Sequence, residues 1–138
     1  MTKRNQHGPI KLERYVRLED HMLKSDAYRS LNVYARCLYI ELKRLYNGTN
    51  NGNIPLSHRD AQPLVGCSDG PIKKAFLELQ DRGFIKVSQK GSFNWKTRID
   101  PTEFSRATTW ILTEYPVDYP TRVLSGPTKE YMRWKPKV

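Results

Sequence analysis

The chain has 138 residues, the size of one domain with a single hydrophobic core. Its 24 Lys and Arg residues outnumber the 14 Asp and Glu residues, and the net charge of +10 favours a polyanionic partner. No uncharged apolar stretch approaches the ~18 residues of a membrane-spanning helix, and residues 1–17 lack the apolar run of a signal peptide. We therefore expect a cytoplasmic protein without a membrane partner.

Residues 1–24 are predicted to form a basic, partly flexible arm, because Gly8 and Pro9 discourage a helix there. The arm is either a solvated tail or a segment that follows the DNA backbone. A short helix is expected from Ser25, its N-cap, to about Leu31.

A longer helix is predicted over residues 32–46, before the Asn47-Gly48 stop. Its expected apolar face consists of side chains three and four positions apart, namely Tyr34, Cys37, Leu38, Leu42 and Leu45. Cys37 is interpreted as a small buried hydrophobic side chain. It and Cys67 lack the spacing of a metal site or a disulfide framework.

A polar loop over residues 47–52 is followed by a short edge strand at 53–56, where a proline is tolerated. Ser57 then offers an N-cap for a helix ending at Gly66, and Pro63 predicts that this helix is short or distorted.

After a tight turn, the next helix is expected from its N-cap Ser68 to Arg82, with Gly83 as the stop. Its core face is predicted to be Ile72, Ala75, Phe76 and Leu79.

Two strands are predicted at residues 84–88 and 108–113, joined by about twenty residues rich in cations and aromatic side chains. Residues 116–138 contain four prolines and a basic end, and little regular structure is expected there.

This order of elements predicts an α+β winged helix-turn-helix domain over residues 25–115, with three to four helices, a small antiparallel sheet and an extended wing. The second helix of such a unit lies in the DNA major groove. Duplex DNA is thus the expected partner. The candidate contacts on the two helices and the wing are Ser57, His58, Arg59, Ser68, Asp69, Gly70, Lys73, Lys74, Lys90, Ser92, Asn94, Lys96, Arg98 and Arg106.

Some side chains in this region have two interpretations. Leu77 lies about 140° from the core direction of its helix, so it either packs beneath the wing or contacts a thymine methyl group. Asp69 either accepts from a cytosine amino group or stabilises the positive helix end. Phe93 and Trp95 are expected to pack at the base of the wing rather than stack on unpaired bases.

Catalytic motifs are missing from the sequence. His7, His21 and His58 are scattered, and there is no Gly-x-Ser-x-Gly elbow, HExxH motif or phosphate-binding glycine loop. We expect no enzyme activity, no metal, no organic cofactor and no small-molecule substrate.

The run of residues 64–85 resembles the turn, recognition helix and first wing strand of bacterial winged helix regulators, with Ala75–Ile85 as its most specific part. Segments 46–52, 90–93, 107–115 and 127–134 resemble a group of little-characterised bacterial helix-turn-helix proteins, some associated with plasmids and phages. The resemblance implies the fold and DNA binding. The helix begins Ser68-Asp-Gly-Pro-Ile where these regulators usually have Ser-x-x-Thr-hydrophobic, so no individual base contact is transferred.

The leading hypothesis is a sequence-specific transcriptional regulator, a repressor of a bacterial or mobile-element gene. Alternatives are a plasmid or phage replication or maintenance protein that binds origin repeats, and a winged helix module that binds another protein. A homodimer would extend the short site that one domain reads, with Tyr131, Met132 and Trp134 of the tail as its candidate contact.

Overall fold

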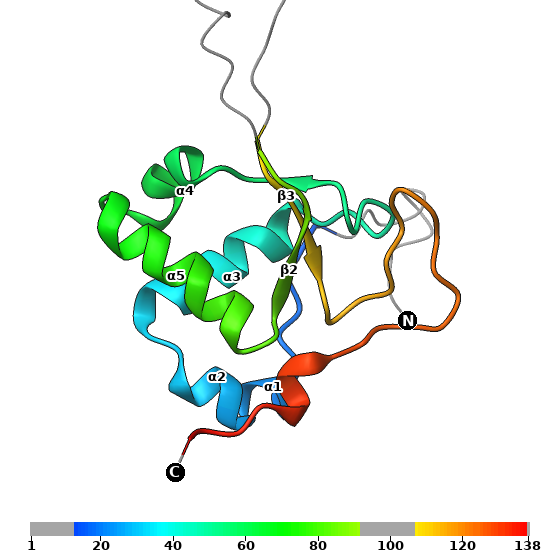
Figure 1. The fold of residues 1–138 in the computed structure, drawn as a ribbon, viewed down its shortest axis with the longest axis horizontal. Coiled ribbons are helices and arrows are strands. Elements are labelled where there is room, and N and C mark those ends of the chain that lie inside the picture. Colours follow the sequence, from blue (N-terminus) through cyan, green and yellow to red (C-terminus); the bar gives the residue numbers. More distant parts are fainter. Residues whose placement is uncertain (1–12, 92–106, 138) are drawn as a thin grey trace, which may run out of the picture.

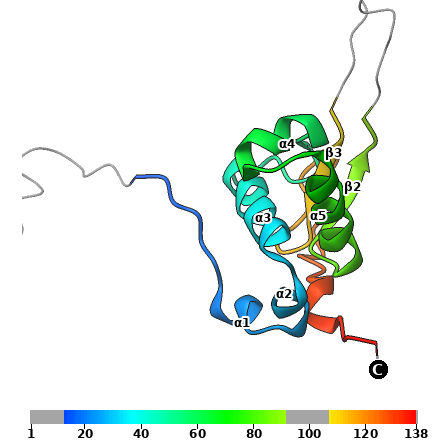
Figure 2. The same cartoon turned by 90° about the vertical axis from the view of Figure 1, so that its left-hand side faces the viewer.

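The computed structural model describes residues 13–91 and 107–137. In chain order its elements are α1 (Asp20–Leu23), α2 (Asp26–Ser30), α3 (Val33–Leu45), β1 (Ile54–Pro55), α4 (His58–Val65), α5 (Asp69–Asp81), β2 (Ile85–Gln89), β3 (Thr109–Leu112) and the 3-10 helix η3 (Glu130–Arg133). Helices α3, α4 and α5 pack together beside the sheet, with α4 at one end of the molecule and α1, α2 and η3 at the other (Figures 1 and 2).

Side-chain caps set the starts of three helices. The Ser25 hydroxyl accepts from the Tyr28 amide, the Asn32 side chain from the Ala35 amide, and the Ser57 hydroxyl from the Asp60 amide. These contacts satisfy donors that the first helical turn leaves without a partner. Ser68 is the N-cap residue of α5, as predicted, but its side chain makes no capping hydrogen bond.

The sheet is antiparallel, in the order β1-β3-β2, so β3 is central. Trp110 pairs with Ile54 on one side and with Val87 on the other, and a bulge separates Val87 from Gln89. Pro55 lies on an edge strand, where its missing N–H leaves no broken ladder bond. The predicted α+β class with a small antiparallel sheet is confirmed, and the arrangement is compatible with a winged helix. The described residues form five α-helices rather than the predicted three to four, because the short α1 falls within the segment expected to be an arm.

The buried face of α3 differs from the prediction. Its buried apolar side chains are Ala35, Leu38, Tyr39 and Leu42, at positions i, i+3, i+4 and i+7, whereas Cys37 and Tyr34 are exposed. The predicted set mixed two neighbouring faces of the helix, because both contain apolar residues at three- and four-residue steps. The true face includes Tyr39, whose ring packs 5.1 Å from that of Phe84.

The core also includes side chains from both ends of the chain. Met22 of α1 is buried, although the arm was expected to be partly flexible through residue 24. Tyr131 of η3 is fully buried and stacks 4.8 Å from Phe84, so the tail, which has little regular structure as predicted, still contributes a core side chain. Because Tyr131 lies in the core of its own chain, it is not available as the predicted dimer contact.

Gly83 shows how closely η3 approaches the end of α5. Its φ of 84° is left-handed, and a Cβ there would lie 2.9 Å from the backbone carbon of Glu130. Gly83 therefore ends α5, as predicted, and also makes room for the tail.

A buried polar cluster joins α3 to the segment after β3. The Lys43 ammonium lies 3.0 Å from the Glu114 carboxylate, and both side chains are almost fully buried. The Tyr39 hydroxyl donates to Glu114 at 2.5 Å, and Lys43 also donates to the Arg17 carbonyl. The ammonium thus holds the arm, α3 and the chain after β3 together.

High pH is expected to destabilise the protein through its buried tyrosines. Burial, together with the charge of Glu114, raises the pKa of Tyr131 from 10.0 to about 12. Above its ordinary pKa the unfolded chain releases the phenol proton while the folded protein retains it, so the free energy of unfolding falls as the pH rises toward about 12. For Tyr131 alone the loss is about 1 kcal/mol at about pH 11, measurable by urea unfolding.

Tyr131→Phe is the control for this pH dependence. The Tyr131 hydroxyl has no hydrogen-bond partner among the described residues, so its removal should cost little stability at neutral pH. The variant should lose less stability than the wild type above about pH 10. Identical alkaline profiles for the two proteins would contradict this assignment.

None of the described helices is both long and apolar enough to cross a membrane.

Candidate nucleic-acid interface

Helices α4 and α5 are joined by a three-residue turn. Gly66 has a left-handed φ of 81°, and the amides of Gly66 and Cys67 both donate to the Gln62 carbonyl. This geometry ends α4 and reverses the chain before Asp69. Because Ile72, Ala75, Phe76 and Leu79 are buried as predicted, the opposite face of α5 is directed away from the core (Figure 2).

The outward face of α5 brings together most of the residues predicted on this helix. Its exposed side chains are Asp69, Lys73, Lys74, Leu77 and Asp81, with Ser68 exposed just before them. Gly70 lies among them, and a Cβ at Gly70 would meet nothing within 4 Å. The first two turns of α5 therefore present an open backbone and two cations to a ligand.

The two lysines differ in their partners. Lys73 lies 3.0 Å from Asp69, one turn earlier, and Asp69 also accepts from Gln62 of α4 at 3.3 Å. Asp69 thus bridges the two helices at the positive end of α5, a structural role that its position alone predicts. Lys74 forms no ion pair within the described ranges, so its charge is available to an external anion.

The start of α4 contributes the second group of predicted contacts. The Ser57 hydroxyl oxygen is engaged by the Asp60 amide at 3.0 Å. The exposed His58 ring packs 4.7 Å from Phe76, which fixes its position without burying it. Arg59 is exposed and has no acidic partner among the residues that the structure describes. Arg59 is therefore the available cation of this turn.

Lys90 is exposed just after β2. There the Gly91 amide donates to the Thr108 hydroxyl at 2.8 Å and joins the two sides of the strand pair. The other predicted wing contacts, Ser92, Asn94, Lys96, Arg98 and Arg106, lie outside the described residues, as do Phe93 and Trp95.

Leu77 is 64% exposed, so no described residue covers it. The wing segment under which Leu77 was expected to pack is not among the described residues.

Tyr34 is a residue of this surface that the sequence did not indicate. It is 42% exposed and lines a groove of about 320 Å³ together with Asn32, Gly70, Pro71 and Lys74. Glu78 accepts from the Asn32 backbone amide at 3.0 Å and from its side chain at 2.7 Å, which holds the start of α3 against α5. A phenol beside Lys74 can donate a hydrogen bond to phosphate oxygens. This role was missed because Tyr34 was predicted to lie on the buried face of α3.

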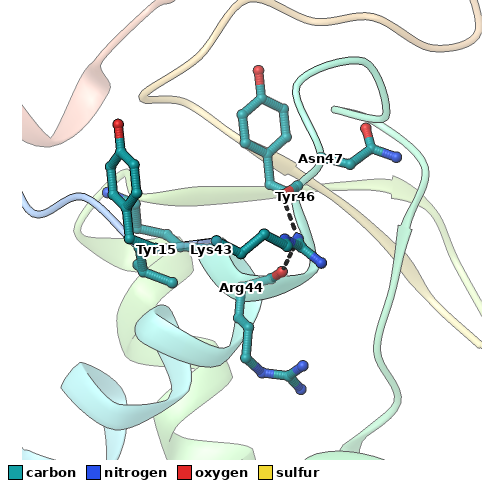
Figure 3. A pocket seen from close by; sticks show the side chains of 7 residues that line it. Tyr15, Lys43, Arg44, Tyr46 and Asn47 are labelled. Atoms are coloured by element: carbon teal, nitrogen blue, oxygen red, sulfur yellow. Dashed lines mark hydrogen bonds between the residues drawn. The ribbon is translucent and has the colours of Figure 1, made fainter. Parts of the chain in front are cut away.

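A second cavity among the described residues lies elsewhere, where the arm crosses the end of α3. It measures about 490 Å³, and Tyr15 and Tyr46 rise on one side of it (Figure 3). The Arg14 guanidinium already donates to the carbonyls of Arg44 and Tyr46, at 2.9 and 3.5 Å. Since the ammonium of Lys43 is buried with Glu114 and Arg44 pairs with Glu41, the cations of this cavity are engaged within the protein.

No group of three or more metal-ligating side chains occurs within residues 13–91 and 107–137. Both cysteines are free: Cys37 is exposed, and Cys67 is half-buried.

The fold defines an α+β domain in which three packed helices lie beside a three-stranded antiparallel sheet. Comparison of the chain with protein-family models, curated proteins and solved structures finds no match.

Proposed function

We propose that this protein is a winged helix domain that binds double-stranded DNA sequence-specifically, with α5 in the major groove. The observation that supports the proposal best is the outward face of α5, where Gly70, Lys73 and Lys74 are exposed on a helix fixed by its opposite face. A helix presented in this way fits the width of the major groove.

The exposed cations of α4 and α5 support the same orientation of α5 in the major groove. Lys74, in the second turn of α5, and Arg59, in the first turn of α4, are exposed without acidic partners among the described residues. Phosphate oxygens are the acceptors that such cations contact when a helix enters the groove between them. The Lys90 ammonium, beyond β2, supplies a further contact from the wing.

We further propose that the protein regulates transcription, as a repressor. A domain that occupies DNA excludes other proteins from its site, which is sufficient for repression. Sequencing the genomic fragments that the protein enriches tests this role. Promoter sites support it, whereas iterated origin repeats would show a replication or maintenance role instead.

Selection of bound duplexes from a random library tests DNA binding itself. The full chain is expected to enrich one sequence motif and to bind it at least about a thousandfold more tightly than unrelated duplex. Competition with both duplexes in an anisotropy titration measures the ratio. Recovery of no motif after repeated rounds, or equal affinity for all duplexes, would contradict the proposal.

A further inference from the structure

Leu77 is the one large apolar side chain on the exposed face of α5. It is 64% exposed, and Lys73 and Lys74 precede it by one helical turn on the same side of the helix. The buried side chains of α5 lie on the opposite face. Leu77 therefore adds nothing to the described core and faces the same side of α5 as the two lysines.

The chemistry of the major groove restricts what such a side chain can contact. Guanine, adenine and cytosine present hydrogen-bond donors and acceptors there, whereas thymine also presents its 5-methyl group. A leucine against purely polar base edges would displace their water without replacing its hydrogen bonds, which is unfavourable. Contact with a methyl group instead buries apolar surface on both partners.

On the basis of the proposed function, we infer that Leu77 is a specificity-determining residue that recognises the 5-methyl group of a thymine. A protein partner fits this surface less well. Cores of protein interfaces are depleted of lysine, and Leu77 lies one turn from two lysines. A single exposed leucine is also far smaller than the contiguous apolar patches that mark protein interaction sites.

Substitution of deoxyuridine for thymine tests the inference, because it removes only the methyl group. In the selected duplex, each thymine is replaced in turn, and binding of the wild-type chain is measured by anisotropy. One replacement is expected to weaken binding about fourfold, the value of one buried methyl group. Leu77→Ala should bind the thymine and deoxyuridine duplexes equally at that position.

Leu124→Ala is the matched control, since Leu124 is also an exposed leucine but lies in the loop between β3 and η3. It should keep the wild-type response to deoxyuridine. Leu77→Ala should also leave the thermal unfolding midpoint unchanged; a clear drop would mean that Leu77 packs within the protein and would overturn the inference.

Wild-type binding that is insensitive to deoxyuridine at every position would overturn the role of Leu77 while leaving sequence-specific binding intact. Absence of a preferred duplex would instead overturn the proposed function together with this inference.

Discussion

Replacing both Lys73 and Lys74 by glutamate is expected to weaken binding of the selected duplex by more than about a hundredfold. Each lysine would supply a charge-assisted hydrogen bond to DNA worth about 1.5–3 kcal/mol, and tenfold in affinity corresponds to about 1.4 kcal/mol. Glutamate adds repulsion from the phosphates. Anisotropy titrations at several salt concentrations measure the effect. The slope of log affinity against log salt concentration should decrease in magnitude by about one for each lysine replaced.

The control for this variant places the same charge change at the other end of the molecule. Lys135 and Lys137 follow η3, at the end opposite α4 (Figure 1). The Lys135→Glu/Lys137→Glu variant has the same net charge as the Lys73→Glu/Lys74→Glu variant. It should keep most of the affinity. Equal losses in both variants would show that overall charge, rather than α5, governs binding.

Replacing Glu114 by alanine is expected to lower the free energy of unfolding by about 3–5 kcal/mol. The substitution leaves the Lys43 ammonium buried without its carboxylate and removes the acceptor of the Tyr39 hydroxyl. A loss of this size is a large part of the stability of a small domain. Urea unfolding monitored by tryptophan fluorescence measures it.

The exposed pair Lys24 and Asp20, at 2.9 Å, provides the contrast. Lys24→Ala should cost less than about 1 kcal/mol, since water screens this pair. Replacing both members of the buried pair, as Lys43→Met with Glu114→Leu, should recover most of the stability that Glu114→Ala loses. If Glu114→Ala lowers the free energy of unfolding by less than about 1 kcal/mol, the buried cluster of Lys43, Glu114 and Tyr39 does not stabilise the fold as proposed.

The sequence predicted the local elements well because their determinants lie within a few residues. Ser25 and Ser57 cap helices through amides three residues away, and Gly66 and Gly83 end helices through their own φ angles. The buried face of α5 was predicted correctly because its apolar residues form one set at helical spacing.

The long-range contacts were missed because nothing local specifies them. Lys43 and Glu114 are 71 residues apart, and neither their spacing nor their composition indicates that they pair. Tyr131 belongs to a proline-containing tail whose local preference for regular structure is weak, and its burial depends on Phe84 and on the space left by Gly83. Tertiary packing determines such positions.

The exposed part of the candidate site on α5 was predicted correctly, whereas the part contributed by α3 was not. Gly70, Lys73 and Lys74 are exposed together on α5, as the helical spacing predicted. Tyr34 was assigned to the wrong face of α3, so its place beside Lys74 was missed. Which of two overlapping apolar faces is buried depends on the neighbouring helices and not on the periodicity of α3 alone.

Amide chemical-shift mapping of the isotope-labelled chain, titrated with the selected duplex, tests the central claim most directly. The largest changes are expected on residues 57–59 and 68–77, at the start of α4 and along α5. Changes centred on residues 14–17 and 43–47, around the cavity at the end of α3, with α5 unaffected, would contradict it.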